Sequence, residues 1–389
     1  MSGGPGADDG ARGPAGGPPA DEEAAAIALA GLPGIGPVSL THLLRSAGGP
    51  REAWEAILDG RLERPGSVPV RTVPWALAAR RADPARRRDS ALAAGIATTW
   101  LGRPDYPRRL VSDPLPPPVL FWRGELGALR RPCVAVIGTR HCTPSGARLA
   151  WELARDLASS GVCVVSGLAL GIDGRAHLGA ITAGVPGATV GIAASGVDVA
   201  YPRRHAALWE RVVECGAVIS ETAPGGPAQR WRFPARNRVI AGLVELVVVV
   251  ESHVAGGSLL TVESALQRGV EVRAVPGPVG SAASEGSNQL LVEGAGPVRS
   301  AADVLDALGD FRPPSKPVPA GPGHRSGRPT SLAPGASRVL EAVGWIPTSL
   351  NQVVGTAALP LGVVSAHLEQ LAAAGLVVEE RGWWQRRGG

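Results

Sequence analysis

Short apolar runs alternate with amphipathic segments through the middle of the chain, from about Pro132 to Val275. Continuous runs such as Val247–Val250 are typical of strands that are buried on both faces of a parallel sheet. The pattern predicts strands at Val134–Ile137, Val162–Val165, Ala188–Ile192, Ala217–Ile219, Leu246–Val250 and Val272–Val275. It predicts helices between them at Ser145–Ser159, Gly174–Gly184, Arg204–Glu214, Ala235–Leu243 and Leu259–Arg268. This alternation indicates an α/β fold with a Rossmann-like parallel sheet, and it leaves the strand order open.

The segments before this core differ in pattern. Residues 1–20 are mainly Gly, Pro and Ala and predict a disordered tail. Residues 21–100 alternate Ala/Leu-rich helical stretches with turns, so we expect a helical domain there, followed by the Rossmann-like domain at 101–311. Leu32–Pro37 and the apolar positions after it have the form of a helix-hairpin-helix or SAM-like unit. Such a hairpin either lets backbone amides approach a phosphate or serves only as a packing unit, and both interpretations stay open.

The segments after the core predict a linker and a further domain. Residues 312–335 are rich in Pro and Gly and predict a flexible linker. Residues 336–386 predict a compact domain of three helices followed by two extended pieces, at Ser337–Val343, Leu350–Val354, Leu361–Ala374, Leu376–Glu379 and Trp383–Gln385. Three helices and a β-wing make a winged-helix domain.

Composition narrows the choice of partner and compartment. The formal net charge is +5, and Lys316 is the only lysine, so nearly every cation is an arginine. Arginine grips phosphate with a planar fork, although a GC-rich genome would produce the same bias, so only its placement argues function. The four cysteines have no zinc-ligand spacing and are expected to be small core residues in a reducing compartment: Cys133, Cys142, Cys163 and Cys215. Without a signal-peptide pattern or an 18-residue apolar stretch, we expect a cytoplasmic protein that does not contact membranes.

The loops after the predicted strands are where an open α/β sheet binds its ligands. These loops carry small residues or arginines and lie on one rim of the sheet: Gly138–Arg140, Ser166–Asp173, Ser195–Arg204, Arg230–Arg238 and Ala255–Thr261. Seven arginines stand between Tyr201 and Arg238, against three glutamates. Trp231 and Phe233 interleave with these arginines, which suits a single strand because bases stack on rings while phosphates meet cations. The alternative is that both rings only anchor the loop in the core.

Enzyme signatures are weak. The first loop lacks G-x-G-x-x-G, and no lysine completes a P-loop, so neither a dinucleotide nor ATP is expected as a cofactor. The candidate catalytic side chains form no evident acid–base pair or nucleophile motif and are Asp173, His177, Asp198, Glu221 and Glu251. We therefore expect no catalytic residues, no metal and no cofactor.

The core resembles the DprA (Smf) family of DNA-processing proteins. The resemblance runs from about Tyr106 to Val298, and its most specific part is the block Phe233-Pro234-Ala235-Arg236-Asn237-Arg238. It implies an extended Rossmann fold that binds single-stranded DNA without sequence preference and without catalysis. It also implies a homodimer that protects incoming strands and delivers the recombinase RecA to them during natural transformation.

The resemblance also assigns DNA-binding residues. By motif these are Gly138, Thr139, Arg140, Ser166, Gly167, Gly171, Arg203, Arg236, Asn237, Arg238, Gly257, Ser258 and Thr261. Four positions depart from the family pattern, which usually has Arg at Leu170, Gly at Ala194, Asn at His205 and Ser at Gly256. The missing cation at Leu170 and the missing hydroxyl at Gly256 would weaken a phosphate pocket without removing Arg140 or Arg236.

Two other functions compete with this hypothesis. Ala255–Glu263 loosely resembles the phosphate loop of nucleotide hydrolases in the lysine-decarboxylase-like Rossmann group, but it lacks that loop's following glycine. The winged helix suggests a duplex-binding transcription regulator. Its third helix carries no arginine, however, and a recognition helix ought to present cations or amides to the major groove.

Overall fold

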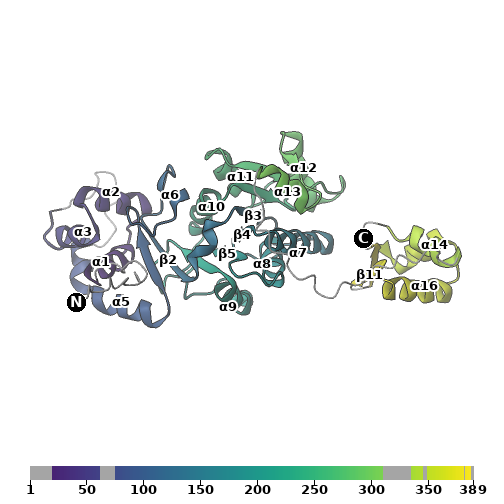
Figure 1. The fold of residues 1–389 in the computed structure, drawn as a ribbon, viewed down its shortest axis with the longest axis horizontal. Helices are drawn as coiled ribbons and strands as arrows, with labels where there is room; N and C mark the ends of the chain where they lie inside the picture. The colour runs from purple at the N-terminus through teal and green to yellow at the C-terminus, as the bar shows by residue number, and fades with distance from the viewer. Residues whose placement is uncertain (1–19, 62–74, 310–333, 345–347, 381, 387–389) are drawn as a thin grey trace, which may run out of the picture.

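The computed structural model describes residues 20–61, 75–309, 334–344, 348–380 and 382–386. Within these ranges a helical N-terminal unit leads into a large α/β unit, and a small unit of helices and strands follows near the C-terminus (Figure 1). The predicted tail at 1–20 and the predicted linker at 312–335 lie almost wholly outside the described residues.

The N-terminal unit is a cluster of short helices. Its elements are α1 (Ala20–Ala30), α2 (Pro37–Ala47), α3 (Pro50–Leu58), α4 (Trp75–Arg81) and α5 (Pro84–Ala93). Proline starts α2, α3 and α5, where its missing N–H would have no helical partner. The Asp83 side chain caps α5 by accepting the backbone N–H of Arg86 at 3.0 Å. The predicted hairpin is present as α1, a short turn and α2.

In the described residues nine strands form one sheet, in the order β1-β2-β6-β5-β4-β3-β7-β8-β9. Neighbours from β6 to β9 are parallel, whereas β1 pairs with β2, and β2 with β6, in antiparallel register. The strands are β1 (Ala97–Trp100), β2 (Val119–Gly124), β3 (Cys133–Ile137), β4 (Cys163–Ser166), β5 (Thr189–Ile192), β6 (Ala217–Ser220), β7 (Leu246–Val249), β8 (Glu271–Ala274) and β9 (Gly296–Pro297). The predicted Rossmann-like α/β fold and its six core strands are confirmed.

Helices cover both faces of this sheet (Figure 1). One face packs against α7 (Pro144–Ser159), α8 (Ile172–Thr182) and α13 (Ala301–Ala307). The other packs against α10 (Arg232–Leu243), α11 (Leu259–Leu266) and α12 (Glu285–Val292), with the short α6 (Arg108–Val111) beside α10. In β3, Val134 and Val136 enter the first core while Ala135 and Ile137 enter the second. A further helix, α9 (Ala206–Cys215), follows β5. The five predicted core helices are therefore confirmed as α7, α8, α9, α10 and α11.

One expectation about the helical segment needs correction. Residues 97–100 fall within the range expected to be helical, but they form β1 and extend the large sheet beyond β2. The Thr98, Thr99 and Trp100 side chains are β-branched or aromatic, which favours an extended strand. Phe121 of β2 is fully buried in one core with Leu29 of α1 and Ile57 of α3. The helical unit is thus packed onto the sheet.

The unit near the C-terminus has the elements expected of a winged helix. Its helices are α14 (Pro334–Ala342), α15 (Leu350–Ala357) and α16 (Leu361–Ala373). Its strands form a three-stranded antiparallel sheet in the order β10 (Thr348–Ser349), β12 (Trp383–Arg386) and β11 (Val377–Glu380). Val339, Val353 and Leu368 form the centre of a separate small core.

Candidate nucleic-acid interface

The order of the strands places the predicted loops on one rim. The chain runs outward from β3 through β4, β5 and β6 on one side, then returns to β7 and β8 on the other. This reversal between β3 and β7 is the point at which open α/β sheets form a crevice beyond the carboxyl ends of their strands.

The loop after β3 is held tightly against its neighbours. The Thr139 N–H donates to the carbonyl of Glu251, at 2.8 Å, and the Thr139 hydroxyl accepts the His141 N–H. A Cβ on Gly138 would lie 2.6 Å from the Glu251 carbonyl oxygen, so only glycine fits. Thr139 is therefore buried and engaged, whereas the Arg140 side chain is exposed on the rim.

The loop after β4 locks against the first one. The Ile172 N–H donates to the Thr139 carbonyl, and a Cβ on Gly171 would lie 2.3 Å from that oxygen. Gly171 also has a φ of +76°, which glycine adopts without strain. Leu168 has a φ of +59°, a strained value for a leucine that costs about 1–3 kcal/mol. Burial of its side chain and a 3.0 Å hydrogen bond from His205 Nδ1 to its carbonyl hold this conformation.

Arg236 of α10 crosses beneath the rim. Its Nη1 donates to the Ile192 carbonyl at the end of β5, at 2.9 Å, while its Nε is buried without a partner among the described residues. A Cβ on Gly167 would lie 1.8 Å from Nη1, so the absence of a side chain there makes room for the guanidinium. Burial lowers the pKa of Arg236 to about 10, against the opposing effect of Asp173, and the side chain remains a cation at neutral pH.

Arg140 and Arg236 line the same small cavity, which we call the rim pocket. Its other lining residues are Gly167, Ala169, Leu170, Ala193, Ala194, Tyr201, Pro202 and Phe233. The volume is about 70 Å³, far below the roughly 300–1,000 Å³ of pockets that enclose a whole small ligand, so a single phosphoryl group suits it better than a nucleotide. Two cations and no carboxylate line it, and this charge favours an anion.

Aromatic side chains stand next to the rim pocket. The Tyr201 and Phe233 ring centroids are 5.5 Å apart, and the Arg140 guanidinium lies 5.3 Å from the Phe233 centroid. Trp231 is 57% exposed and Tyr201 is 45% exposed, so neither serves mainly as a core anchor. Phe233 is half-buried and supports both Tyr201 and Arg140. Sequence reasoning weighed Trp231 and Phe233 but did not single out Tyr201, although it stands directly before Pro202 and Arg203.

Arg203 lies in the short 3-10 helix Arg203–His205, directly after the pocket residue Pro202. It is exposed, as is Arg204. Among ion pairs between described residues, none includes Arg140, Arg203 or Arg204. Their charge is therefore free to meet a polyanion.

Other predicted site residues do not reach the rim pocket. Ser166 is buried and donates to the Val136 carbonyl, and Ser258 is buried against Ser252. Arg238 turns away from the pocket and bonds Glu221 and the Leu115 carbonyl. Asn237, Gly257 and Thr261 are also outside the pocket lining, so that of the predicted site residues only Arg140, Gly167 and Arg236 line the rim pocket.

The acidic and histidine side chains considered for catalysis have structural partners. Asp173 accepts the Gly167 N–H, Asp198 accepts the Gly225 N–H, and Glu251 accepts the Thr143 N–H at the start of α7. Burial raises the pKa values of Asp173, Glu221 and Glu251. His177 is buried beside Thr189 at 2.7 Å, and burial lowers its pKa to about 3, so it is neutral at physiological pH.

The described residues offer neither a metal site nor a membrane-spanning helix. Across the described residues, no cluster of three or more His, Cys, Asp or Glu side chains could hold a metal ion. All four cysteines are free thiols, and Cys133 and Cys163 are buried neighbours on β3 and β4. In the described part of the chain no helix is both long and apolar enough to cross a membrane.

The fold and the rim define a Rossmann-like α/β protein that gathers arginines and aromatic rings at the carboxyl ends of its strands. Residues 97–309 match the sequence model of the family described as DNA recombination-mediator protein A. The chain belongs to this family.

Known proteins agree with this assignment. The chain is 35% identical to Protein Smf of Synechocystis over 314 residues, which cover 73% of this chain and 78% of that protein. It is 41% identical to the DNA processing protein DprA of Streptococcus pneumoniae over 189 residues, covering 49% of this chain and 66% of that protein. The X-ray structure of the Streptococcus pneumoniae DprA superposes with a TM-score of 0.61 and 30% identity, covering 74% of this chain and 97% of that one. A DprA-like role in DNA processing follows.

Arg238 of the R-N-R block is expected to matter for stability, because its partner is the buried Glu221. Arg238→Ala leaves the Glu221 carboxylate buried without its cation, which should cost about 3–5 kcal/mol of unfolding free energy. Because burial already raises the pKa of Glu221, the folded variant takes up a proton more readily, and its deficit should grow as pH rises. Urea unfolding near neutral pH and about two pH units lower measures this, with the exposed Arg140→Ala as the control that stays near wild type. Equal stability of Arg238→Ala and wild type would contradict the assignment.

Proposed function

We propose that this protein binds single-stranded DNA without sequence preference along the rim. The observation that carries the proposal is the rim pocket: two arginines without a lining carboxylate, next to exposed aromatic rings. A phosphate placed there would meet Arg140 and Arg236, and a neighbouring base would stack on Tyr201, which lines the same pocket. An aromatic ring can stack on any base, and phosphate contacts do not depend on the base. This chemistry therefore gives affinity without sequence readout.

We propose that this binding requires no catalysis. The buried acids and His177 are engaged in hydrogen bonds or an ion pair, and the segment Ala255–Glu263, which suggested a nucleotide hydrolase, does not line the rim pocket. These contacts favour a binding role over hydrolysis. A cytoplasmic location suits the proposed partners, DNA and RecA.

We further propose a homodimer. Large apolar side chains are exposed on and near α11 and α12, at the β8 side of the sheet, where they would suit a second copy: Leu260, Leu266, Val279 and Val292. The family relation to DprA supports the same assembly.

Removing a rim cation should weaken strand binding and its salt dependence together. Arg140→Ala should lower the affinity for a single strand, and the slope of log affinity against log salt should fall by about 0.7, since one phosphate contact is lost. Fluorescence anisotropy over a salt series measures both values. Arg130→Ala removes an exposed arginine outside the pocket and should change neither. The proposal fails if Arg140→Ala and Arg236→Lys both keep the wild-type affinity and slope.

Restoring the cation that the family usually has should strengthen binding. Leu170 lines the rim pocket, so Leu170→Arg would place a third cation there. We expect tighter single-strand binding and a salt slope steeper by about 0.7. Leu170→Met, which keeps an apolar side chain, is the matched control. Weaker binding by Leu170→Arg would show that a phosphate does not occupy this pocket.

We also propose that the bound protein delivers RecA to the strand during natural transformation. Bases stacked on the rim rather than read by hydrogen bonds would stay accessible to a recombinase. RecA filament formation on single strands should begin sooner in the presence of this protein than in its absence. Arg140→Ala should lose this acceleration in proportion to its lost affinity, and an unchanged lag with wild-type protein would contradict the proposal.

A further inference from the structure

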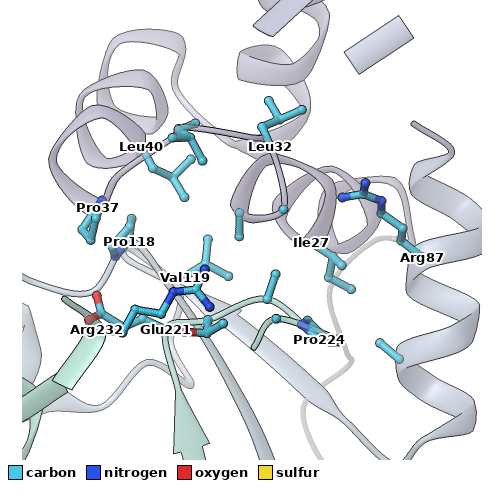
Figure 2. A pocket seen from close by; sticks show the side chains of 18 of the residues that line it. Ile27, Leu32, Pro37, Leu40, Arg87, Pro118, Val119, Glu221, Pro224 and Arg232 are labelled. Carbon is cyan, nitrogen blue, oxygen red and sulfur yellow. The ribbon is translucent and has the colours of Figure 1, made fainter. Parts of the chain in front are cut away.

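A second and much larger cavity lies between the helical unit and the sheet (Figure 2). We call it the hairpin cleft. Its volume is about 1080 Å³, at the upper end of the range for ligand pockets. One wall is the turn Gly31–Pro37 with the adjoining ends of α1 and α2, and a second is formed by α5. The third consists of the loops after β5 and β6. Shared packing of α1 and α3 with β2 holds these walls together.

The hairpin cleft joins the rim pocket. Ala193, Ala194 and Arg236 line both cavities, so the two cavities are neighbours, and a strand bound in one would need only a short span to reach the other. Trp231 belongs to the cleft lining and is 57% exposed, and the Arg232 guanidinium lies 5.1 Å from the centroid of its ring. The cleft therefore has an exposed flat ring in its lining.

The charge of the cleft favours a polyanion. Five arginines line it against three carboxylates: Arg81, Arg86, Arg87, Arg232 and Arg236 against Asp83, Asp198 and Glu221. Each carboxylate already has a partner, because Asp83 caps α5, Asp198 accepts the Gly225 N–H and Glu221 pairs with Arg238. The described residues show no ion pair to any of the five arginines.

The floor of the cleft is apolar. Figure 2 shows Ile27, Leu32, Leu40 and Val119 around the cavity, with Arg87 and Arg232 on opposite sides of it. An apolar floor flanked by cations suits a chain that has flat bases on one side and phosphates on the other. A duplex hides its bases and would leave this floor unused.

We propose that the hairpin cleft is a second segment of the single-strand path. Trp231 stacks a base within the cleft, and Arg81, Arg86 and Arg87 of α4 and α5 hold phosphates there. This inference rests on the proposed function of the rim and adds a site on the helical unit. It predicts that long strands use the cleft while short strands occupy only the rim.

The test compares two strand lengths on the full-length protein. A strand of about 5 nucleotides fits the rim, and one of about 20 spans both segments. We expect the triple variant Arg81→Ala, Arg86→Ala, Arg87→Ala to bind the short strand as wild type does. It should bind the long strand more weakly, with a salt slope smaller by about 2. The charge-matched control Arg108→Ala, Arg130→Ala, Arg211→Ala removes exposed arginines that line neither cavity and should match wild type on both lengths.

A second variant tests the cleft even if the triple variant does not fold. Because Trp231 is mostly exposed, Trp231→Ala should fold normally and lose about tenfold in long-strand affinity, which Trp231→Phe should restore. The inference is overturned if the triple variant and Trp231→Ala bind both lengths like the control while Arg140→Ala weakens both, and the rim proposal then stands. The inference is also overturned if the triple variant binds both strands like wild type but loses binding of polyglutamate, an acidic polypeptide. That result would assign the cleft to an acidic protein segment. Failure of wild-type protein to bind either strand overturns both proposals.

Discussion

The buried guanidinium of Arg236 is the interaction on which the site depends. It comes from α10, donates to the end of β5 and lies against Gly167 in the loop after β4, so one side chain joins three elements. A cation buried in this way needs nearby negative charge, and Asp173 at the start of α8 provides it. The unpartnered Nε leaves part of its hydrogen-bonding capacity unused. An anion at the rim pocket would add negative charge beside this cation.

The loops around Arg236 are arranged in advance of any ligand. Gly138 and Gly171 let two loops approach more closely than side chains would allow, and the left-handed Leu168 is held by burial and by His205. Because these loops are already ordered, the rim loses little conformational entropy when a strand binds. The exposed arginines and rings around it remain adaptable, as suits a ligand without a fixed sequence.

Much of the fold was predictable because the core strands are continuous apolar runs and the core helices carry an apolar face. The strand order was not, since it depends on contacts between distant segments. The strands β1 and β2 were missed for a related reason: their place is set by the pairing of β2 with β6, the pairing of β1 with β2, and packing against α1. The sequence predicted which loops form the site, but not which side chains of those loops line the rim pocket. Arg236 and Arg238 stand two positions apart on one helix and so point in different directions, one into the rim pocket and one to Glu221. The hairpin cleft was beyond sequence reasoning, because it exists only where the helical unit meets the sheet.

We propose that Arg140 and Arg236 together hold a phosphate of a single strand. A crystal structure of the protein with a short oligodeoxythymidine tests it most directly. We expect a phosphate oxygen within hydrogen-bond distance of both guanidinium groups and a neighbouring base against Tyr201. A strand bound on another face, with the rim pocket holding only water, would contradict it.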